Sequence, residues 1–262
     1  MKINKKILIV AALIFLIVDC ALLSYKIIFK KEYPHRVHKP KIDYKYSVFL
    51  TSDDGPLVGS KYLDQIVRDY EVPFTIFLVG KPMSSHKKLM TNLLRYKSNP
   101  YALLANHSFT HANFHYKKFY SDPKGVEKDF IKNEKYLKLT SKIGRLPGRN
   151  VYSIGDVTKG EPNALKAAKL LSKDIDYKFY GWDYELRHGS DAKITESSAI
   201  KHYNRIKELL KSGKTFRKNE IIILMHDQMF TSLESQETLG ELILLLQDDE
   251  EIKLKTLKEY KL

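Results

Sequence analysis

The stretch "VFLTSDDGPLVG" (residues 48–59) places two adjacent aspartates, Asp53 and Asp54, after an apolar run and before a Gly-Pro pair. The apolar run predicts a buried β-strand, and Asp, Gly and Pro together favour a turn at its end. Taken alone, the motif is most simply a turn. Polar residues at the carboxyl end of a parallel strand also form active sites, so the rest of the chain has to decide between the two.

Strands and helices alternate through residues 46–262. Short apolar runs predict strands at 46–51, 74–80, 101–108, 177–183, 220–227 and 252–260. Stretches with apolar residues at helical spacing predict helices at 60–70, 86–97, 122–140, 161–173, 197–212 and 235–249. This alternation predicts one α/β domain with a parallel sheet, since no linker-like stretch divides it.

The chain is basic, with 45 Lys and Arg against 31 Asp and Glu, a formal net charge of +14. Such a balance suits nucleic acid, anionic lipid or acidic glycans, and a solvated basic surface explains it equally well. Nucleic-acid binding would need basic residues interleaved with aromatic ones, and only the stretch "YKKFYSDPK" (116–124) has this pattern. The solvated start of a helix explains that stretch equally well. We therefore expect no nucleic-acid partner. The single Cys20 excludes an internal disulfide.

The first 29 residues carry three lysines followed by an apolar run, Ile7–Val18, that resumes after Asp19. Because no clean small-x-small cleavage site follows, we expect an uncleaved signal anchor spanning the membrane once, with a cleaved signal peptide as the alternative. Residues 30–45 are basic, contain two prolines and are expected to be a tether. The domain at 46–262 would then lie on the extracytoplasmic side of the cytoplasmic membrane. The sequence does not determine the oligomeric state.

Chemically versatile residues gather at the predicted strand ends and in the irregular segment 143–150. They are Asp53, Asp54, His107, His111, Arg145, Trp182, Asp183 and His226. The carboxyl ends of parallel strands open on one face of a barrel or wound sheet, so we expect these side chains to meet there.

A metal-dependent hydrolase is the chemistry that such a set supports. The spacing of His107 and His111 puts two imidazoles on one side of a helical turn. Two imidazoles and a carboxylate make a three-ligand site that leaves a position open for water. A second carboxylate can act as general base, and a histidine across the site can protonate the leaving group. Each motif alone has a simpler explanation, but their order along the chain favours amide or ester hydrolysis.

Five motifs in order resemble those of the polysaccharide deacetylases of the NodB-homology family (carbohydrate esterase family 4). They are "TSDDGP" (51–56), "HSFTH" (107–111), "RLPGRN" (145–150), "GWD" (181–183) and "LMH" (224–226). The similarity covers essentially all of residues 46–262. Three departures stand out: Ser52 replaces the usual Phe, Gly148 follows Pro147 directly, and Trp182 precedes Asp183. Because the order of Trp182 and Asp183 is reversed in the fourth motif, the nearby Glu185 and Arg187 are also candidates for the role of its aspartate.

The resemblance implies a distorted, incomplete (β/α) barrel of the TIM type with about seven units. It also implies a role for each matching residue. Asp53 would be the general base, Arg145 would keep it ionised, His226 would be the general acid, and Asp183 would orient or tune His226. Asp54, His107 and His111 would hold a divalent metal, most often Zn²⁺, with Co²⁺ and Mn²⁺ as alternatives. Trp182, Pro147 and Leu224 would bind substrate.

The implied reaction is removal of N-acetyl groups from an N-acetylated amino-sugar glycan or glycolipid of the cell envelope. Three alternatives stay open. One is an O-acetyl esterase using the same site, and another is a non-catalytic relative that binds glycans. A non-catalytic relative would be expected to have lost a metal ligand or the base, and neither is lost here. The third alternative is a basic, membrane-tethered interaction protein.

Overall fold

The computed structural model describes residues 44–260. The expected signal anchor at 1–29 lies outside these residues, as does nearly all of the tether at 30–45. Within the described part of the chain, no helix has both the length and the apolar character needed to cross a bilayer.

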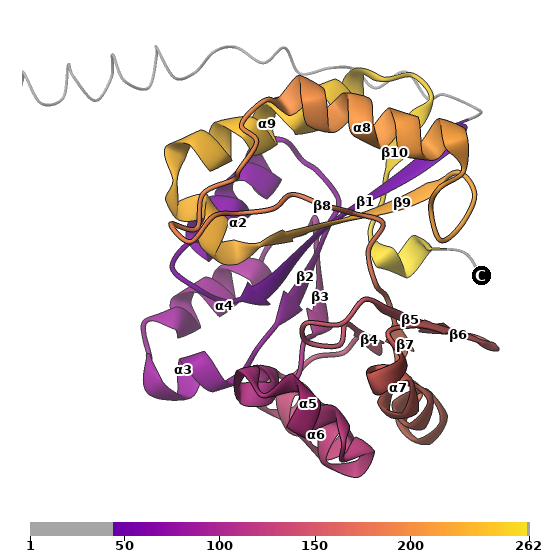
Figure 1. The fold of residues 1–262 in the computed structure, drawn as a ribbon. Helices are drawn as coiled ribbons and strands as arrows, with labels where there is room; N and C mark the ends of the chain where they lie inside the picture. Colours follow the sequence, from indigo (N-terminus) through magenta and orange to yellow (C-terminus); the bar gives the residue numbers. More distant parts are fainter. Residues whose placement is uncertain (1–43, 261–262) are drawn as a thin grey trace, which may run out of the picture. The chain divides into compact units, whose positions relative to one another are not determined.

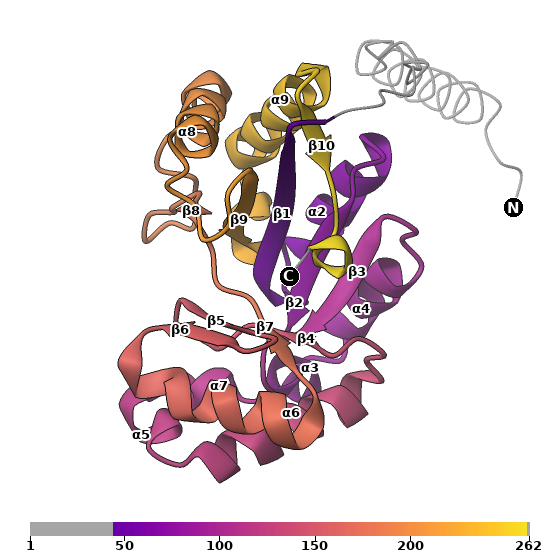
Figure 2. The same cartoon turned by 90° about the vertical axis from the view of Figure 1, so that its right-hand side faces the viewer.

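A single sheet runs through the described residues, and the α-helices pack on its outer face (Figures 1 and 2). Its strands are β1 (Tyr46–Gly55), β2 (Phe74–Leu78), β3 (Ala102–Asn106), β4 (Ile143–Gly144), β5 (Val151–Ile154), β6 (Val157–Gly160), β7 (Lys178–Phe179), β8 (Tyr184–Glu185), β9 (Glu220–His226) and β10 (Ile252–Leu254). The α-helices are α2 (Ser60–Asp69), α3 (Lys81–Ser85), α4 (Leu89–Lys97), α5 (Tyr116–Tyr120), α6 (Pro123–Leu137), α7 (Pro162–Ile175), α8 (Ala199–Ser212) and α9 (Leu233–Asp248). Short 3₁₀ turns are η1 (His111–Phe114), η2 (Asp227–Thr231) and η3 (Leu257–Glu259).

The sheet is an open half-barrel. Parallel pairing joins β8, β9, β1, β2, β3, β4 and β7 in that spatial order. The β5–β6 hairpin adds to the β7 edge in antiparallel fashion. Among the described residues β6 and β8 do not pair, so the sheet does not close. The predicted incomplete barrel is confirmed in this form.

Strand β1 occupies the centre of the sheet. One edge pairs with β9 over Ser47–Asp53. The other edge pairs with β10 near its start and with β2 near its end. Figures 1 and 2 show α8 and α9 near the start of β1, and α5, α6 and α7 beyond its end. The carboxyl end of β1 therefore opens between these groups of helices.

The alternation of side chains along the strands separates two cores. In β1, Val48 and Leu50 face the large cluster beneath the helices. Phe49 faces the inside of the half-barrel, where it meets Phe77 and Ile222. Because side chains alternate, Thr51 and Asp53 share the inner face with Phe49. The inner face is thus apolar near the start of β1 and polar at its end.

The helix predictions are confirmed within a few residues, but three strand predictions were wrong in extent. The strand predicted at 46–51 continues to Gly55, so Asp53 and Asp54 belong to it. In 177–183 only Lys178–Phe179 is a strand, because the backbone then turns to bring Trp182 beside Asn150, whose amide bonds the Trp182 backbone. In 252–260 the strand stops at Leu254 and the η3 turn follows, with Thr256 and Glu259 capping it. The β5–β6 hairpin, α3 and α5 were not predicted.

Candidate active site

A β-bulge at the end of β1 brings both aspartates of "TSDDGP" to the same side. Ser52 pairs with Ile76 and Gly55 with Leu78, so β1 advances three residues while β2 advances two. Asp54 is in the bulge, and its φ of 70° accommodates the extra residue. In a regular strand adjacent side chains point to opposite faces. Here Asp53 Oδ2 and Asp54 Oδ1 lie 3.5 and 3.6 Å from the same atom, His107 Nε2.

Asp54, His107 and His111 form a three-ligand cluster whose donor atoms all lie within 4.8 Å of one another. Asp54 Oδ1 lies 3.1 Å from His111 Nε2. That oxygen is buried and accepts no well-aligned hydrogen bond from the described residues. Burial raises the pKa of the Asp54 carboxyl, and a cation bound beside it would favour the ionised form.

Both histidines are prepared as neutral ligands. The Nδ1–H of His107 donates to the Arg145 carbonyl at 2.9 Å, which leaves the Nε2 lone pair facing the cluster. Burial lowers the pKa of His107 and lowers that of His111 to about 4, so both imidazoles are neutral near pH 7. Two neutral imidazoles and one carboxylate fit a divalent first-row metal such as zinc.

A left-handed turn positions His111 in the cluster. The expected helical turn across "HSFTH" was wrong: His107 directly follows β3, and His111, Ala112, Asn113 and Phe114 have φ values of 51, 56, 47 and 61°. Each such non-glycine residue costs about 1–2 kcal/mol. The backbone N–H of His111 donates to Ser108 Oγ, and Lys81 donates to Asn113. These bonds hold the strained turn that points His111 at Asp54.

Arg145 is completely buried beneath the site. Its Nη1 donates to Thr51 Oγ1 and to Asp53 Oδ1, each at 2.8 Å. Its Nε and Nη2 donate to the carbonyls of Tyr180 and Gly181. Burial alone would raise the pKa of Asp53, but Arg145 and the neighbouring histidines outweigh it and bring the pKa below its ordinary value. Asp53 is therefore ionised, with Oδ2 left facing the cluster.

His226 lies beside Asp53, because the two residues are in register on the neighbouring strands β9 and β1. Its Nδ1 is buried and has no hydrogen-bond partner among the described residues. The ring of His188 packs edge-on against it, with centroids 5.2 Å apart. His188 Nδ1–H donates to Gly189 O, and Gln228 lies 3.2 Å from its other nitrogen. The sequence analysis did not identify His188, since only the fold brings it to His226.

Asp183 does not orient His226, which corrects the expected role. Its Oδ1 accepts from the Phe216 N–H at 2.6 Å and its Oδ2 from the Ile222 N–H at 2.8 Å. Both oxygens are thus engaged by backbone donors around the start of β9. The carboxylate fixes that loop to the sheet, and His188 occupies the position beside the general-acid candidate.

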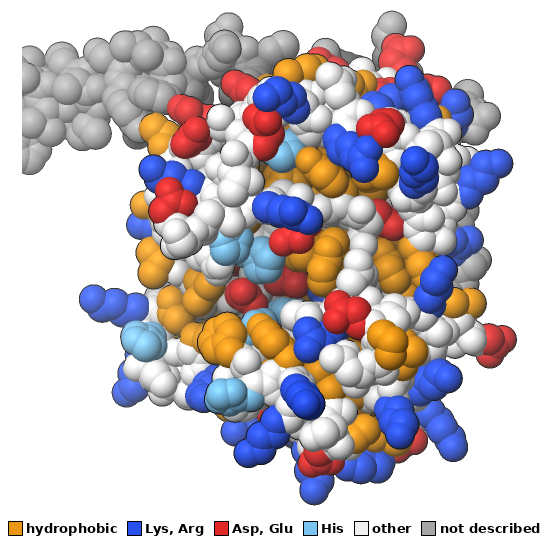
Figure 3. Space-filling view, viewed as in Figure 1, with side chains coloured by type: hydrophobic (Ala, Val, Ile, Leu, Met, Phe, Trp, Pro, Cys, Tyr) orange, Lys and Arg blue, Asp and Glu red, His pale blue; other side chains and the backbone are white. Residues whose placement is uncertain are grey.

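The three expected substrate-binding residues surround the site at different depths. Trp182 is half-buried, with its ring centroid 5.8 Å from the Arg145 guanidinium. Leu224 is two residues before His226 on β9, on the same face, and is 3% exposed. Pro147 is buried, and its carbonyl accepts from the Tyr120 hydroxyl at 2.7 Å. Figure 3 shows acidic and histidine side chains together in a hollow bordered by hydrophobic ones.

A buried aspartate behind the site explains Ser52. Ser52 points away from the metal ligands: its Oγ donates to Asp227 Oδ1 at 2.5 Å. Asp227 also accepts from the hydroxyls of Ser60 and Tyr96. These hydroxyls come from β1, α2 and α4, so Asp227 joins three elements behind the bulge. Although these three hydrogen bonds favour the ionised carboxylate, burial raises the pKa of Asp227 to about 6.

The Asp227→Asn variant should remove a pH-dependent part of the stability. Between the unfolded pKa of 3.8 and the folded pKa of about 6, the folded protein holds a proton that the unfolded chain has lost. The stabilisation is therefore full below pH 3.8 and is lost as the pH rises through 6. With a shift of roughly two units, the wild type should lose up to about 3 kcal/mol relative to the variant.

Chemical denaturation of both proteins from pH 4 to pH 8 measures this difference. The Asp156→Asn variant, which changes an exposed aspartate in the β5–β6 turn, is the control and should follow the wild type. Parallel stability curves for the wild type and Asp227→Asn would show that the raised pKa is wrong.

Comparison with known proteins supports the same family as the motifs. Residues 42–168 match the sequence profile of the polysaccharide deacetylase family. A chitooligosaccharide deacetylase of Rhizobium leguminosarum bv. phaseoli is 29% identical over 135 residues, which are 49% of this chain and 55% of that protein. The alignment thus spans about half the length of this curated relative.

Solved structures share the fold. The catalytic domain of a peptidoglycan N-acetylglucosamine deacetylase from Eubacterium rectale superposes with a TM-score of 0.61 and 17% identity, covering 85% of this chain and 93% of that one. A carbohydrate esterase family 4 enzyme from Streptococcus mutans gives a TM-score of 0.58 at 19% identity, covering 81% and 86%. At these identities the likeness confirms the half-barrel alone.

Proposed function

We propose that this chain, which carries a polysaccharide deacetylase domain, is a metal-dependent hydrolase that removes N-acetyl groups from an N-acetylated glycan of the cell envelope. The observation that carries the proposal is the bulge at Asp53 and Asp54. The bulge sets the Asp54 carboxylate beside two neutral imidazoles and the Asp53 carboxylate against the buried Arg145. Both carboxylates lie within 3.6 Å of His107 Nε2. Ligand and base are thereby separate residues. The homologous deacetylases support the same chemistry.

Asp54, His107 and His111 would hold the metal, which when bound polarises the acetyl carbonyl and lowers the pKa of a water molecule. Asp53 would accept a proton from water on Oδ2, because Arg145 already occupies Oδ1 and keeps the carboxylate ionised. His226, on the neighbouring strand β9, donates a proton to the departing sugar nitrogen. His188 restricts the His226 ring from one edge. Trp182 and Leu224 would border the acetyl group.

Removal of the metal should abolish activity without unfolding the protein. After dialysis against a chelator, acetate release from N-acetylglucosamine oligomers should fall to background and return on addition of Zn²⁺, Co²⁺ or Mn²⁺. Thermal unfolding should still be cooperative, because Arg145 and the sheet hold the site residues without the metal. Full acetate release from a metal-free sample, verified by elemental analysis, would contradict the proposal. Assaying O-acetylated glycans beside the N-acetylated ones distinguishes a deacetylase from an esterase.

The domain would act outside the cytoplasmic membrane, held there by a single-pass anchor at 1–29 and the basic tether at 30–45. The support is the sequence alone: lysines before the apolar run Ile7–Val18 and no clean cleavage site after it. Cell fractionation with external protease tests the arrangement. The domain should be in the membrane fraction and should be released by protease added to the outside of spheroplasts.

A further inference from the structure

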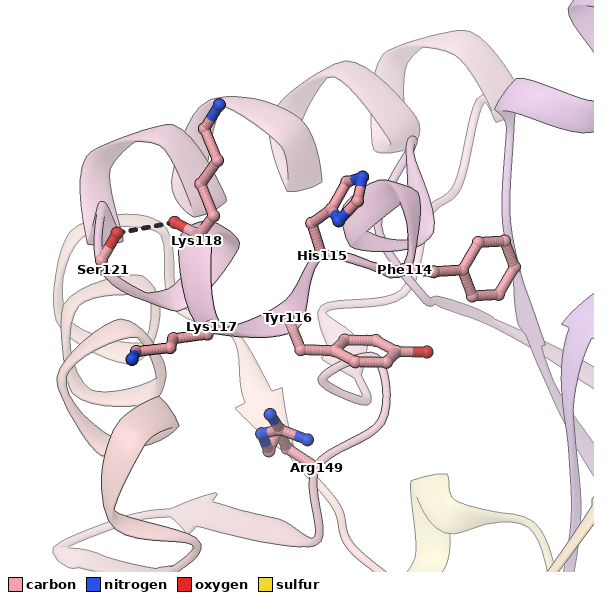
Figure 4. A pocket seen from close by; sticks show the side chains of 7 residues that line it. All are labelled: Phe114, His115, Tyr116, Lys117, Lys118, Ser121 and Arg149. Carbon is pink, nitrogen blue, oxygen red and sulfur yellow. Dashed lines mark hydrogen bonds between the residues drawn. The ribbon is translucent and has the colours of Figure 1, made fainter.

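A pocket of about 650 Å³, whose lining residues Figure 4 shows, adjoins the metal-ligand cluster through ring contacts with His111. It is lined by Phe114, His115, Tyr116, Lys117, Lys118, Ser121 and Arg149. Among these described residues are two aromatic side chains and three with permanent positive charge, and none carries a carboxylate. The pocket includes part of the alternating basic and aromatic stretch 116–124, which the catalytic chemistry leaves unexplained.

The aromatic side of the pocket touches the metal site directly. The rings of Phe114 and Tyr116 pack edge-on against His111, with centroids at 5.1 and 5.9 Å. Figure 4 shows both rings extending in the same direction from the ribbon, whereas Lys117 extends to the opposite side and Lys118 points away from the rings. Phe114 is 76% exposed, although a ring of this size is normally covered in a soluble domain. The left-handed turn that positions His111 also holds Phe114 outward, so both depend on the same strained backbone.

The positive charges of the pocket are largely unpaired. No ion pair joins Lys117 or Lys118 to an acidic residue within 44–260. The Arg149 guanidinium lies 5.1 Å from the centroid of the Tyr116 ring and shares its charge with Glu161, whose Oε2 is 3.3 Å from Nε. Cations that line a hollow without carboxylates create a positive potential there, which favours an anionic ligand.

We propose that this pocket and its basic rim bind an acidic stretch of the same glycan chain, next to the sugar whose acetyl group is removed. The proposal rests on the deacetylase function and specifies its substrate: an N-acetylated glycan with acidic residues. The exposed Phe114 and Tyr116 rings would pack against the apolar face of a neighbouring sugar. Lys117 and Lys118, which point away from these rings, would pair with carboxylate, phosphate or sulfate groups of sugars farther along the chain. A neutral polymer would use the rings but gain nothing from the lysines.

The test compares neutral and acidic substrates on a Lys117→Ala/Lys118→Ala double variant. Acetate release is measured with metal-loaded enzyme on N-acetylglucosamine oligomers, and on oligomers of equal length whose alternate sugars carry a carboxylate or a phosphate. Two exposed charge contacts predict a KM for acidic oligomers that rises roughly threefold to tenfold in the double variant. The kcat should stay within about twofold, because these side chains do not touch the ligands or the base. The KM for the neutral oligomer should not change.

The matched control is Lys87→Ala/Lys88→Ala, which removes the same charge from another adjacent, exposed pair, before α4. An equal rise of KM in both double variants would assign the effect to net charge and would overturn the proposal. So would a wild-type enzyme that prefers the neutral oligomer. The carboxylate and phosphate oligomers show which acidic group the pocket takes. Phe114→Ala should raise the KM for neutral and acidic oligomers alike.

A binding measurement separates this proposal from the proposed function. If the wild type releases no acetate from any glycan, the deacetylase function fails. Calorimetric titration of wild type and of the Lys117→Ala/Lys118→Ala variant with the acidic oligomer then decides on the pocket. Binding that is weakened in the double variant supports it, and equal or absent binding overturns it.

Discussion

Asp53→Asn should reduce kcat by about 10²–10⁴-fold while the protein keeps its metal. Asp53 is not part of the three-ligand cluster, so its loss as a base does not remove a donor. An asparagine oxygen can still accept from Arg145 Nη1, which preserves the local structure. The amide cannot take up a proton from water, so the loss should appear in kcat more than in KM. Acetate release and metal content of the purified variant measure the two effects separately.

Two comparison variants sharpen the result. Asp54→Asn should lose activity together with metal, because its Oδ1 is one of the cluster's donor atoms. Asp183→Asn should keep turnover within a few-fold and lower thermal stability, because Asp183 bonds two backbone amides and not His226. If Asp53→Asn retained wild-type kcat, the base assignment would be wrong. A loss of kcat in Asp183→Asn as large as in Asp53→Asn would restore the family's expected role for Asp183.

Arg145→Met should destabilise the fold by about 3–5 kcal/mol, the cost of leaving one partner of a buried ion pair alone. Arg145 is completely buried, and its guanidinium bonds Asp53, Thr51 and two carbonyls. Without it, burial would raise the pKa of Asp53. The acidic limb of the activity profile should therefore move to higher pH. Chemical denaturation and a pH–rate profile measure the two consequences.

A double-variant comparison tests the cause. In the Asp53→Asn background the same Arg145→Met change should cost less, because no unpaired carboxylate is left behind. Arg149→Met removes a nearby arginine that is half-buried and pairs with the exposed Glu161, and should cost less than about 1 kcal/mol. Equal stability losses for Arg145→Met and Arg149→Met would mean that the buried pair contributes little.

The regular part of the fold is predictable because its sequence pattern repeats a physical period. In β1 and β9 the apolar runs are long, and the alternation of Phe49, Thr51 and Asp53, or of Ile222, Leu224 and His226, assigns the inner face. The shorter strands carry no such period. The β4 and β7 strands have two residues each, and only their neighbours make them strands.

The site was predictable where its residues lie at a strand end or directly after it. Asp53 and Asp54 are among the last three residues of β1, His226 is the last residue of β9, and His107 directly follows β3. Two features were not predictable. The bulge that turns both aspartates inward depends on the register with β2, which a local Asp-Asp-Gly-Pro motif does not encode. His188 meets His226 only because β8 lies beside β9. Long-range pairing thus decides which of several polar residues near a motif takes part, and that is why Asp183 was assigned to the wrong task.

The central place of β1 has a consequence for how the protein is made. This strand is near the beginning of the chain, yet β9 and β10 along its edges are synthesised about 170 and 200 residues later. Until then β1 exposes unpaired backbone groups and an apolar face. Such distant pairings slow folding and leave intermediates prone to aggregation. Asp53 and His226 can therefore meet only after almost the whole domain has emerged from the ribosome, so an incomplete chain has no assembled catalytic pair.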